Sequence, residues 1–129
     1  MDSRPSVQLT APAERASVRL ARILAAGVAA DAGLSIDDTE DLRVAVSELV
    51  ALLVEGKDDA GDSIVVRFHR FPGEVTVDGE RPAMAGPPDT TAVDDLALEI
   101  LRVVVDQHSF DASDGGRRFH LVKRSRVRT

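Results

Sequence analysis

The chain has 129 residues, 43% of them hydrophobic and 29% charged, with a formal net charge of −6, a balance typical of one globular domain. It contains no cysteine, which excludes disulfide frameworks, thiolate nucleophiles and Cys-ligated zinc. No apolar run approaches the roughly 20 residues that cross a bilayer, and the start, Met-Asp-Ser-Arg-Pro, has no apolar core of the kind that a signal peptide carries. We therefore expect a cytoplasmic protein without membrane association.

The charges are distributed unevenly along the chain. Residues 1–116 contain 10 basic residues and all 22 acidic ones, whereas residues 117–129 contain six basic residues. A basic end could contact phosphates, but it is better explained as the solvated end of a last strand, and the acidic body would repel nucleic acid. We expect no direct nucleic-acid binding, a single domain over 1–123 and a basic C-terminal tail over 124–129.

The first half of the chain predicts one strand and two helices. Alternation over Ser6–Thr10 indicates an edge strand. Pro12 suits a first helical turn, and good helix formers from Ala13 to about Ala32 follow it, before Gly33. The apolar face of this helix is expected at Leu20, Ile23, Leu24, Gly27 and Val28. Ser35 is placed to cap a second helix, Asp37 to about Glu55, whose leucines and valines recur at buried helical spacing.

The second half predicts two hairpins separated by a helix. Ile64–Phe68 and Glu74–Asp78 form the first hairpin around Pro72-Gly73, and an open loop over Gly79–Asp89 follows. A third helix, about Val93 to Gln107, is expected to turn Leu96, Ala97, Ile100, Val103 and Val104 inward. The last hairpin pairs Ser109–Ala112 with Arg117–Lys123. This order predicts an α+β fold: a two-layer sandwich of a mostly antiparallel sheet with helices on one face.

Three stretches resemble the anti-sigma-factor branch of the histidine-kinase-like (GHKL) ATPase fold. Asp41-Leu-Arg-Val-Ala-Val-Ser-Glu48 is similar to the start of the family's nucleotide-binding helix, Leu98-Glu-Ile-Leu-Arg-Val-Val-Val-Asp106 to its last helix, and Gly115-Gly-Arg-Arg-Phe-His-Leu-Val-Lys123 to its closing strand. Family members bind an alternative sigma factor and hold it inactive. Many are also Ser/Thr kinases that use Mg-ATP to phosphorylate an antagonist protein.

The resemblance also implies where an ATP site would lie, and there this chain departs from the family. Glu48 stands where the family has its catalytic Glu, but the Mg²⁺-binding Asn position holds Leu52, which cannot coordinate a metal ion. Only Asp78-Gly79 remains of the adenine-contacting Asp-x-Gly-x-Gly. The phosphate-binding glycine lid is replaced by Val93-Asp-Asp-Leu96, whose carboxylates would repel a triphosphate. A degenerate site is therefore expected, with Glu48, Asp78 and Gly79 as vestigial nucleotide-binding residues.

Structural explanations stand beside these functional ones. Glu48 is better explained as a relic, or as a carboxylate paired with a backbone group or an arginine. Asp78-Gly79 is also a common turn pair. The three histidines have no metal-ligand spacing, and no common catalytic motif occurs. We expect no catalytic residues, no metal and no cofactor.

A partner-binding surface is predicted on the first helix. Arg15, Arg19 and Arg22 recur at i, i+4 and i+7 and form one basic stripe that suits acidic partner side chains, although a solvated helix face is the alternative. The resemblance then implies a homodimeric, stress-response transcription regulator that sequesters a sigma factor and responds to an antagonist (anti-anti-sigma) protein. The alternatives are an active Mg-ATP-dependent kinase of the antagonist, and a decoy that pairs with a relative.

Overall fold

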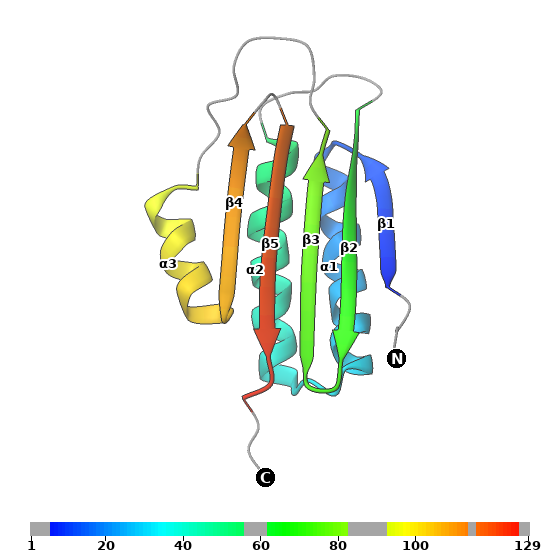
Figure 1. Ribbon diagram of the computed structural model, residues 1–129, viewed down its shortest axis with the longest axis vertical. Coiled ribbons are helices and arrows are strands. Elements are labelled where there is room, and N and C mark those ends of the chain that lie inside the picture. The colour runs from blue at the N-terminus through cyan, green and yellow to red at the C-terminus, as the bar shows by residue number, and fades with distance from the viewer. Residues whose placement is uncertain (1–5, 56–61, 83–92, 114–115, 127–129) are drawn as a thin grey trace.

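A computed structural model describes residues 6–55, 62–82, 93–113 and 116–126 (Figure 1). The elements in chain order are β1 (Val7–Pro12), α1 (Arg15–Asp31), α2 (Ile36–Val54), β2 (Ser63–Phe71), β3 (Glu74–Arg81), α3 (Asp95–Val104), β4 (Gln107–Ser113) and β5 (Gly116–Arg124). The predicted order of strands and helices is confirmed.

The five strands form one sheet in the order β1-β2-β3-β5-β4, and every neighbouring pair is antiparallel. Helices α1 and α2 lie side by side behind the sheet. Helix α3 lies beside β4, so that α2 is between α1 and α3 (Figure 1). The predicted α+β sandwich with an antiparallel sheet is thus confirmed.

The core lies between the sheet and α2. Alternate residues of β2 and β3 point inward, as the two-residue period of a strand requires. They meet the face of α2 that carries Leu42, Val46, Leu49 and Leu53, all fully buried. Helix α2 begins at the predicted cap, because the Ser35 hydroxyl accepts a hydrogen bond from the N–H of Asp38 at 3.0 Å.

Three predicted boundaries are wrong. Pro12 is the last residue of β1 rather than part of a helix. Gly79 was expected to open a loop, yet β3 continues through it to Arg81, since β5 supplies partners up to that residue. The rest of the expected loop, residues 83–89, lies outside the described residues. The third helix ends at Val104, because Gln107 already pairs with β5.

The predicted inner face of α1 is also wrong. The helix packs on α2 through Ala21, Ala25, Val28 and Ala29 and leaves Leu20 and Ile23 exposed. Small residues let the two helices approach closely, so the alanine row faces inward rather than the larger side chains. The predicted stop is confirmed, since Gly33 has φ +80° and follows the helix in a Schellman motif.

Helix α3 also turns a different side toward the core than the sequence predicted. Ala97 and Val104 are buried as predicted, and Leu101 joins them. Leu96 and Val103, expected to point inward, are each 71% exposed. One short helix beside a sheet edge buries only a narrow stripe, which leaves part of its apolar surface in solvent.

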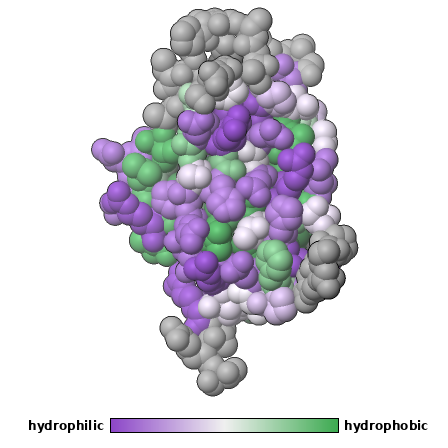
Figure 2. Space-filling model, viewed as in Figure 1, coloured by the Kyte–Doolittle hydropathy of each residue, from purple (hydrophilic) through white to green (hydrophobic). Residues whose placement is uncertain are grey.

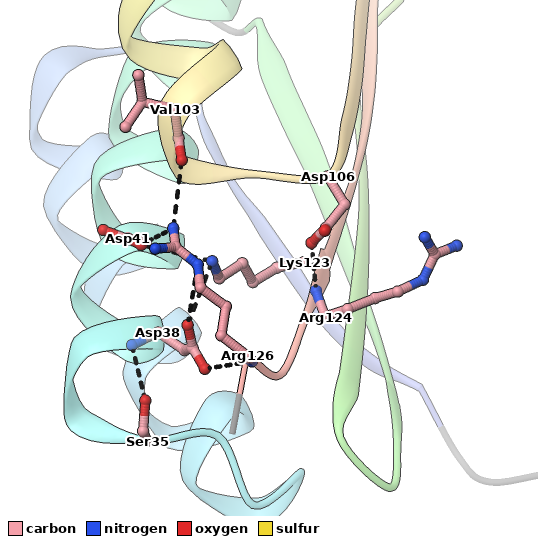
Figure 3. A network of polar contacts seen from close by, with 8 residues as sticks. All are labelled: Ser35, Asp38, Asp41, Val103, Asp106, Lys123, Arg124 and Arg126. Carbon is pink, nitrogen blue, oxygen red and sulfur yellow. Dashed lines mark hydrogen bonds and ion pairs between the residues drawn. The ribbon is translucent and has the colours of Figure 1, made fainter. Parts of the chain in front are cut away.

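A buried charge network joins the C-terminal residues to α2 and α3 (Figure 3). Lys123 is 1% exposed, and its Nζ lies 3.4 Å from carboxylate oxygens of both Asp38 and Asp41. The N–H of Arg126 donates to Asp38 at 2.9 Å, and its guanidinium donates to Asp41 at 2.6 Å and to the Val103 carbonyl at 3.2 Å. Residues 124–126, assigned from the sequence to a tail, are therefore packed against the domain.

Candidate functional site

A cavity of about 340 Å³ lies where the start of α1, the last turns of α2 and the start of α3 meet. Glu48 and Leu52 of α2 line it, together with Arg15 of α1 and Asp94, the residue that caps α3. Glu48 and Leu52 are positions that the family resemblance assigned to the nucleotide helix, Asp94 belongs to the replaced lid, and Arg15 was predicted only to bind a partner. The structure therefore brings Glu48, Leu52 and the replaced lid into one place.

The side chains of this cavity do not fit a magnesium-bound triphosphate. Among the described residues, Glu48, Glu55 and Asp94 bring carboxylates to the lining of this cavity, and Arg15 brings a guanidinium; the excess of negative charge disfavours an anionic ligand. The start of α3 is not open to a phosphate either, because the Asp94 carboxylate accepts the N–H of Ala97 at 2.7 Å. Leu52 offers no oxygen to a metal ion.

Glu48 shows neither of the pairings proposed for it from the sequence. Its side chain is half-buried, and in the described part of the chain it makes no hydrogen bond or ion pair. It also borders a second, smaller hollow between α1 and α2, which Arg22 lines. Glu48 is therefore accessible from both hollows.

Two buried arginines close the C-terminal end of α2. Arg81 of β3 donates to the Leu53 carbonyl at 2.9 Å and to Asp62 at 3.0 Å. Arg117 of β5 donates to the Leu52 carbonyl at 2.9 Å and to the Glu55 carbonyl at 2.7 Å. They satisfy carbonyls that a helix end otherwise leaves without partners. In the sequence, Arg117 belonged only to a basic segment, so this role was not predicted.

Asp78 and Gly79 do not line the cavity at Glu48, because both lie in β3, inside the sheet. Asp78 points to the face away from the helices, where its carboxylate contacts His120 Nδ1 at 2.6 Å and His69 Nε2 at 3.7 Å. Gly79 is buried under the ring of Phe119, its partner on β5. The structure does not bring these two residues to the helix cavity, and neither is in a turn.

The three arginines predicted to bind a partner are all exposed on α1. Two apolar side chains that were expected to face inward are exposed among them. Leu20 is 49% exposed and Ile23 is 64% exposed. We call Arg15, Arg19, Leu20, Arg22 and Ile23 the α1 face. Apolar side chains exposed together among arginines are typical of a protein interface.

An antiparallel five-stranded sheet layered on helices, with a cavity at the end of α2, defines the histidine-kinase-like ATPase fold. In the crystal structure of the RsbU and RsbW domains of Rv1364c from Mycobacterium tuberculosis, a region matches 98% of this chain with a TM-score of 0.72 and 21% identity. That likeness shows the fold, and it covers 35% of the other chain.

The sequence comparison points to the same branch. The serine-protein kinase RsbW of Halalkalibacterium halodurans is 30% identical over 66 residues, which are 51% of this chain and 41% of the relative. No family model matches the chain. The two matches together bear out the resemblance to the anti-sigma-factor branch of the fold. The chain spans less than half of the length of either protein.

None of the helices in the described ranges is long and apolar enough to cross a membrane.

Proposed function

We propose that this protein is an anti-sigma factor that binds an alternative sigma factor through the α1 face and has little or no kinase activity. The exposed α1 face carries the proposal, since it combines Leu20 and Ile23 with three arginines. The sequence match to RsbW supports the kind of partner. An antagonist protein would release the sigma factor, and the setting would be a cytoplasmic stress response.

The partner is tested with the alternative sigma factors of the organism that encodes the chain, by biolayer interferometry. Arg19→Glu should weaken binding of the cognate sigma factor about tenfold, because like charges in an interface are repulsive. The matched control is Arg118→Glu, a charge reversal on an exposed residue of the opposite sheet face. Equal affinities for Arg19→Glu and the control would contradict the proposal.

We also propose that the cavity at Glu48 has lost Mg-ATP binding. Three carboxylates and Leu52 support this. Calorimetric titration of Mg-ATP, with ADP as control, should give no binding at up to about millimolar nucleotide, which corresponds to less than about 4 kcal/mol of binding free energy.

The alternative is an active serine kinase of the antagonist protein. It is favoured by the name of the curated relative, a serine-protein kinase, and by the accessibility of Glu48 from the cavity. Micromolar Mg-ATP binding, with phosphate transfer to an antagonist that Glu48→Gln abolishes, would put this function first.

A further inference from the structure

Three polar side chains form a row on the face of the sheet that is turned away from the helices. Figure 2 shows this face, which is mostly hydrophilic. Ser109 of β4 is the cross-strand partner of His120 of β5, and His120 is in turn the partner of Asp78 of β3. Directly paired residues project to the same face of a sheet, with Cβ atoms about 5 Å apart. Because β5 lies between β3 and β4, the histidine stands between the serine and the aspartate, and all three line one hollow of about 350 Å³.

The aspartate orients the histidine. Asp78 Oδ1 lies 2.6 Å from His120 Nδ1. An ionised carboxylate only accepts hydrogen bonds, so Nδ1 carries the hydrogen and Nε2 keeps its lone pair. Since Asp78 is on the β3 side of the ring, this contact turns the opposite edge of the ring toward β4, the strand of Ser109. The other oxygen of Asp78 lies 3.7 Å from His69 Nε2, so the carboxylate is held between two rings.

The hydroxyl of Ser109 is available for reaction. It is exposed, and within the described ranges it makes no hydrogen bond, either to His120 or to another residue. A serine hydroxyl becomes a nucleophile when a neighbouring base takes its proton and a third group orients that base. In proteins without substrate, the nucleophile and the base often lie apart and approach only in the complex. Ser109, His120 and Asp78 therefore stand in the order that such a nucleophile needs.

The same hollow offers a guanidinium to a substrate. Arg118 is exposed, lines the hollow and makes no ion pair with other described residues, whereas Arg67 is already engaged by Glu80 at 3.3 Å. Asp111 stands opposite Arg118 on β4, so the hollow suits one anionic group rather than several. Arg118 is a diagonal neighbour of Ser109, about 7 Å away, a span that a small ester bridges. The substrate class that fits is a short acyl ester with one carboxylate.

We propose that Ser109 is a nucleophile that takes the acyl group of such an ester and passes it to water. Ser109 Oγ bonds to the acyl carbon while its proton moves to His120 Nε2. The bond from the acyl carbon to the leaving oxygen then breaks, and that oxygen takes the proton from Nε2. Water repeats the two steps on the acyl-serine and releases the carboxylic acid. This activity uses neither a sigma factor nor a nucleotide, so it is tested apart from the function proposed above.

Acetylsalicylate, a small aryl acetate with one carboxylate, is the probe. Incubation with the full chain should release salicylate and leave one acetyl group on Ser109, which peptide mass mapping locates. Ser109→Ala should remove this adduct. His120→Gln should slow its formation about tenfold or more, because general-base catalysis typically contributes about a hundredfold or more. Ser63→Ala, at an exposed serine that begins β2, is the matched control and should react like the wild type.

Two further variants separate orientation from binding. Asp78→Asn should lower the maximal rate of acetylation but not the half-saturating concentration, because Asp78 orients His120 and does not touch the ester. Arg118→Gln should raise the half-saturating concentration of acetylsalicylate several-fold and leave the reaction of phenyl acetate, a neutral ester, unchanged. Circular dichroism spectra equal to that of the wild type would establish that the variants are folded. An absence of acetyl-Ser109, an adduct that forms equally fast in His120→Gln, or equal effects of Arg118→Gln on both esters would each overturn the proposal.

Discussion

Among the described residues, Lys123 and Asp38 are charged side chains almost without access to solvent, at 1% and 2% exposed. Burial by itself would raise the pKa of Asp38, but the hydrogen bond from the Arg126 N–H and the charge of Lys123 outweigh it and hold the pKa below its ordinary value. A lowered folded-state pKa stabilises the protein at every pH above the unfolded pKa. That contribution is lost as the pH falls through the folded-state value.

Asp38→Asn should therefore destabilise the protein at neutral pH and flatten its acid response. The cost at pH 7 is expected to be about 1–3 kcal/mol, because Lys123 keeps Asp41 but loses one of its two carboxylates, and the Arg126 N–H loses a charged acceptor. Below about pH 4, near the unfolded pKa of an aspartate, the difference between variant and wild type should shrink. Urea unfolding at several pH values measures both effects. Asp37→Asn, an exposed neighbour in the same turn, is the control, and an equal loss there would contradict the argument.

The ring of Phe119 leaves no room for a side chain at Gly79. A Cβ at this position would overlap the ring of Phe119, with Cε2 nearest and Cζ 2.6 Å away. Gly79→Ala should destabilise the domain by about 1–3 kcal/mol, the usual cost of overpacking a core. Phe119→Leu frees the space, so the double variant should lose less stability than the two single variants added together. Additive losses in denaturant titrations would show that the ring is not the cause.

At the scale of elements, the sequence predicted what depends on period and on local signals. Helix α2 begins at the expected Ser35 cap, and the hairpin turn at Pro72-Gly73 connects β2 to β3 as predicted. Which side of α1 faces inward could not be predicted, because alanine, leucine and isoleucine occur all round the helix and close packing on α2 selects the alanines. The strand through Gly79 continues because of β5, a partner distant in sequence.

The candidate site could also be predicted only where its residues are related by the period of one element. Glu48 and Leu52 are one helical turn apart, so their position in one cavity follows from the period of α2. Asp78 was joined to them only by resemblance, and the alternation of β3 turns its side chain to the other face of the sheet. The roles of Arg81 and Arg117 depend on tertiary contacts that no local sequence pattern indicates.

The closed C-terminal end of α2 gives a prediction at this scale. Arg117→Met keeps the length of the side chain but leaves carbonyls of Leu52 and Glu55 without their donor. The free energy of unfolding should fall by about 1–3 kcal/mol, the cost of a buried acceptor that loses its partner. Arg118→Met removes the neighbouring, exposed guanidinium and should change stability little. Guanidinium chloride unfolding of the two variants compares them, and equal effects would contradict the capping role.

At the scale of the whole molecule, the two sides of the sheet differ in chemistry. The helix side carries the basic α1 face with its exposed Leu20 and Ile23. On the opposite face of the sheet, Asp78 pairs with two histidines. Under the proposed function only the helix side contacts the sigma factor, so a charge reversal on the opposite face of the sheet should leave its binding unchanged.

Arg19→Glu and Arg118→Glu should consequently differ in how they bind the sigma factor. Arg19→Glu should bind poorly at every chain concentration, because its α1 face is altered and the introduced carboxylate meets acidic side chains of the partner. Arg118→Glu, on the opposite face of the sheet, keeps an intact α1 face and should bind as the wild type does. Fluorescence titrations of labelled sigma factor at two chain concentrations measure these affinities. If the two variants lost affinity equally, the α1 face would not be the contact surface.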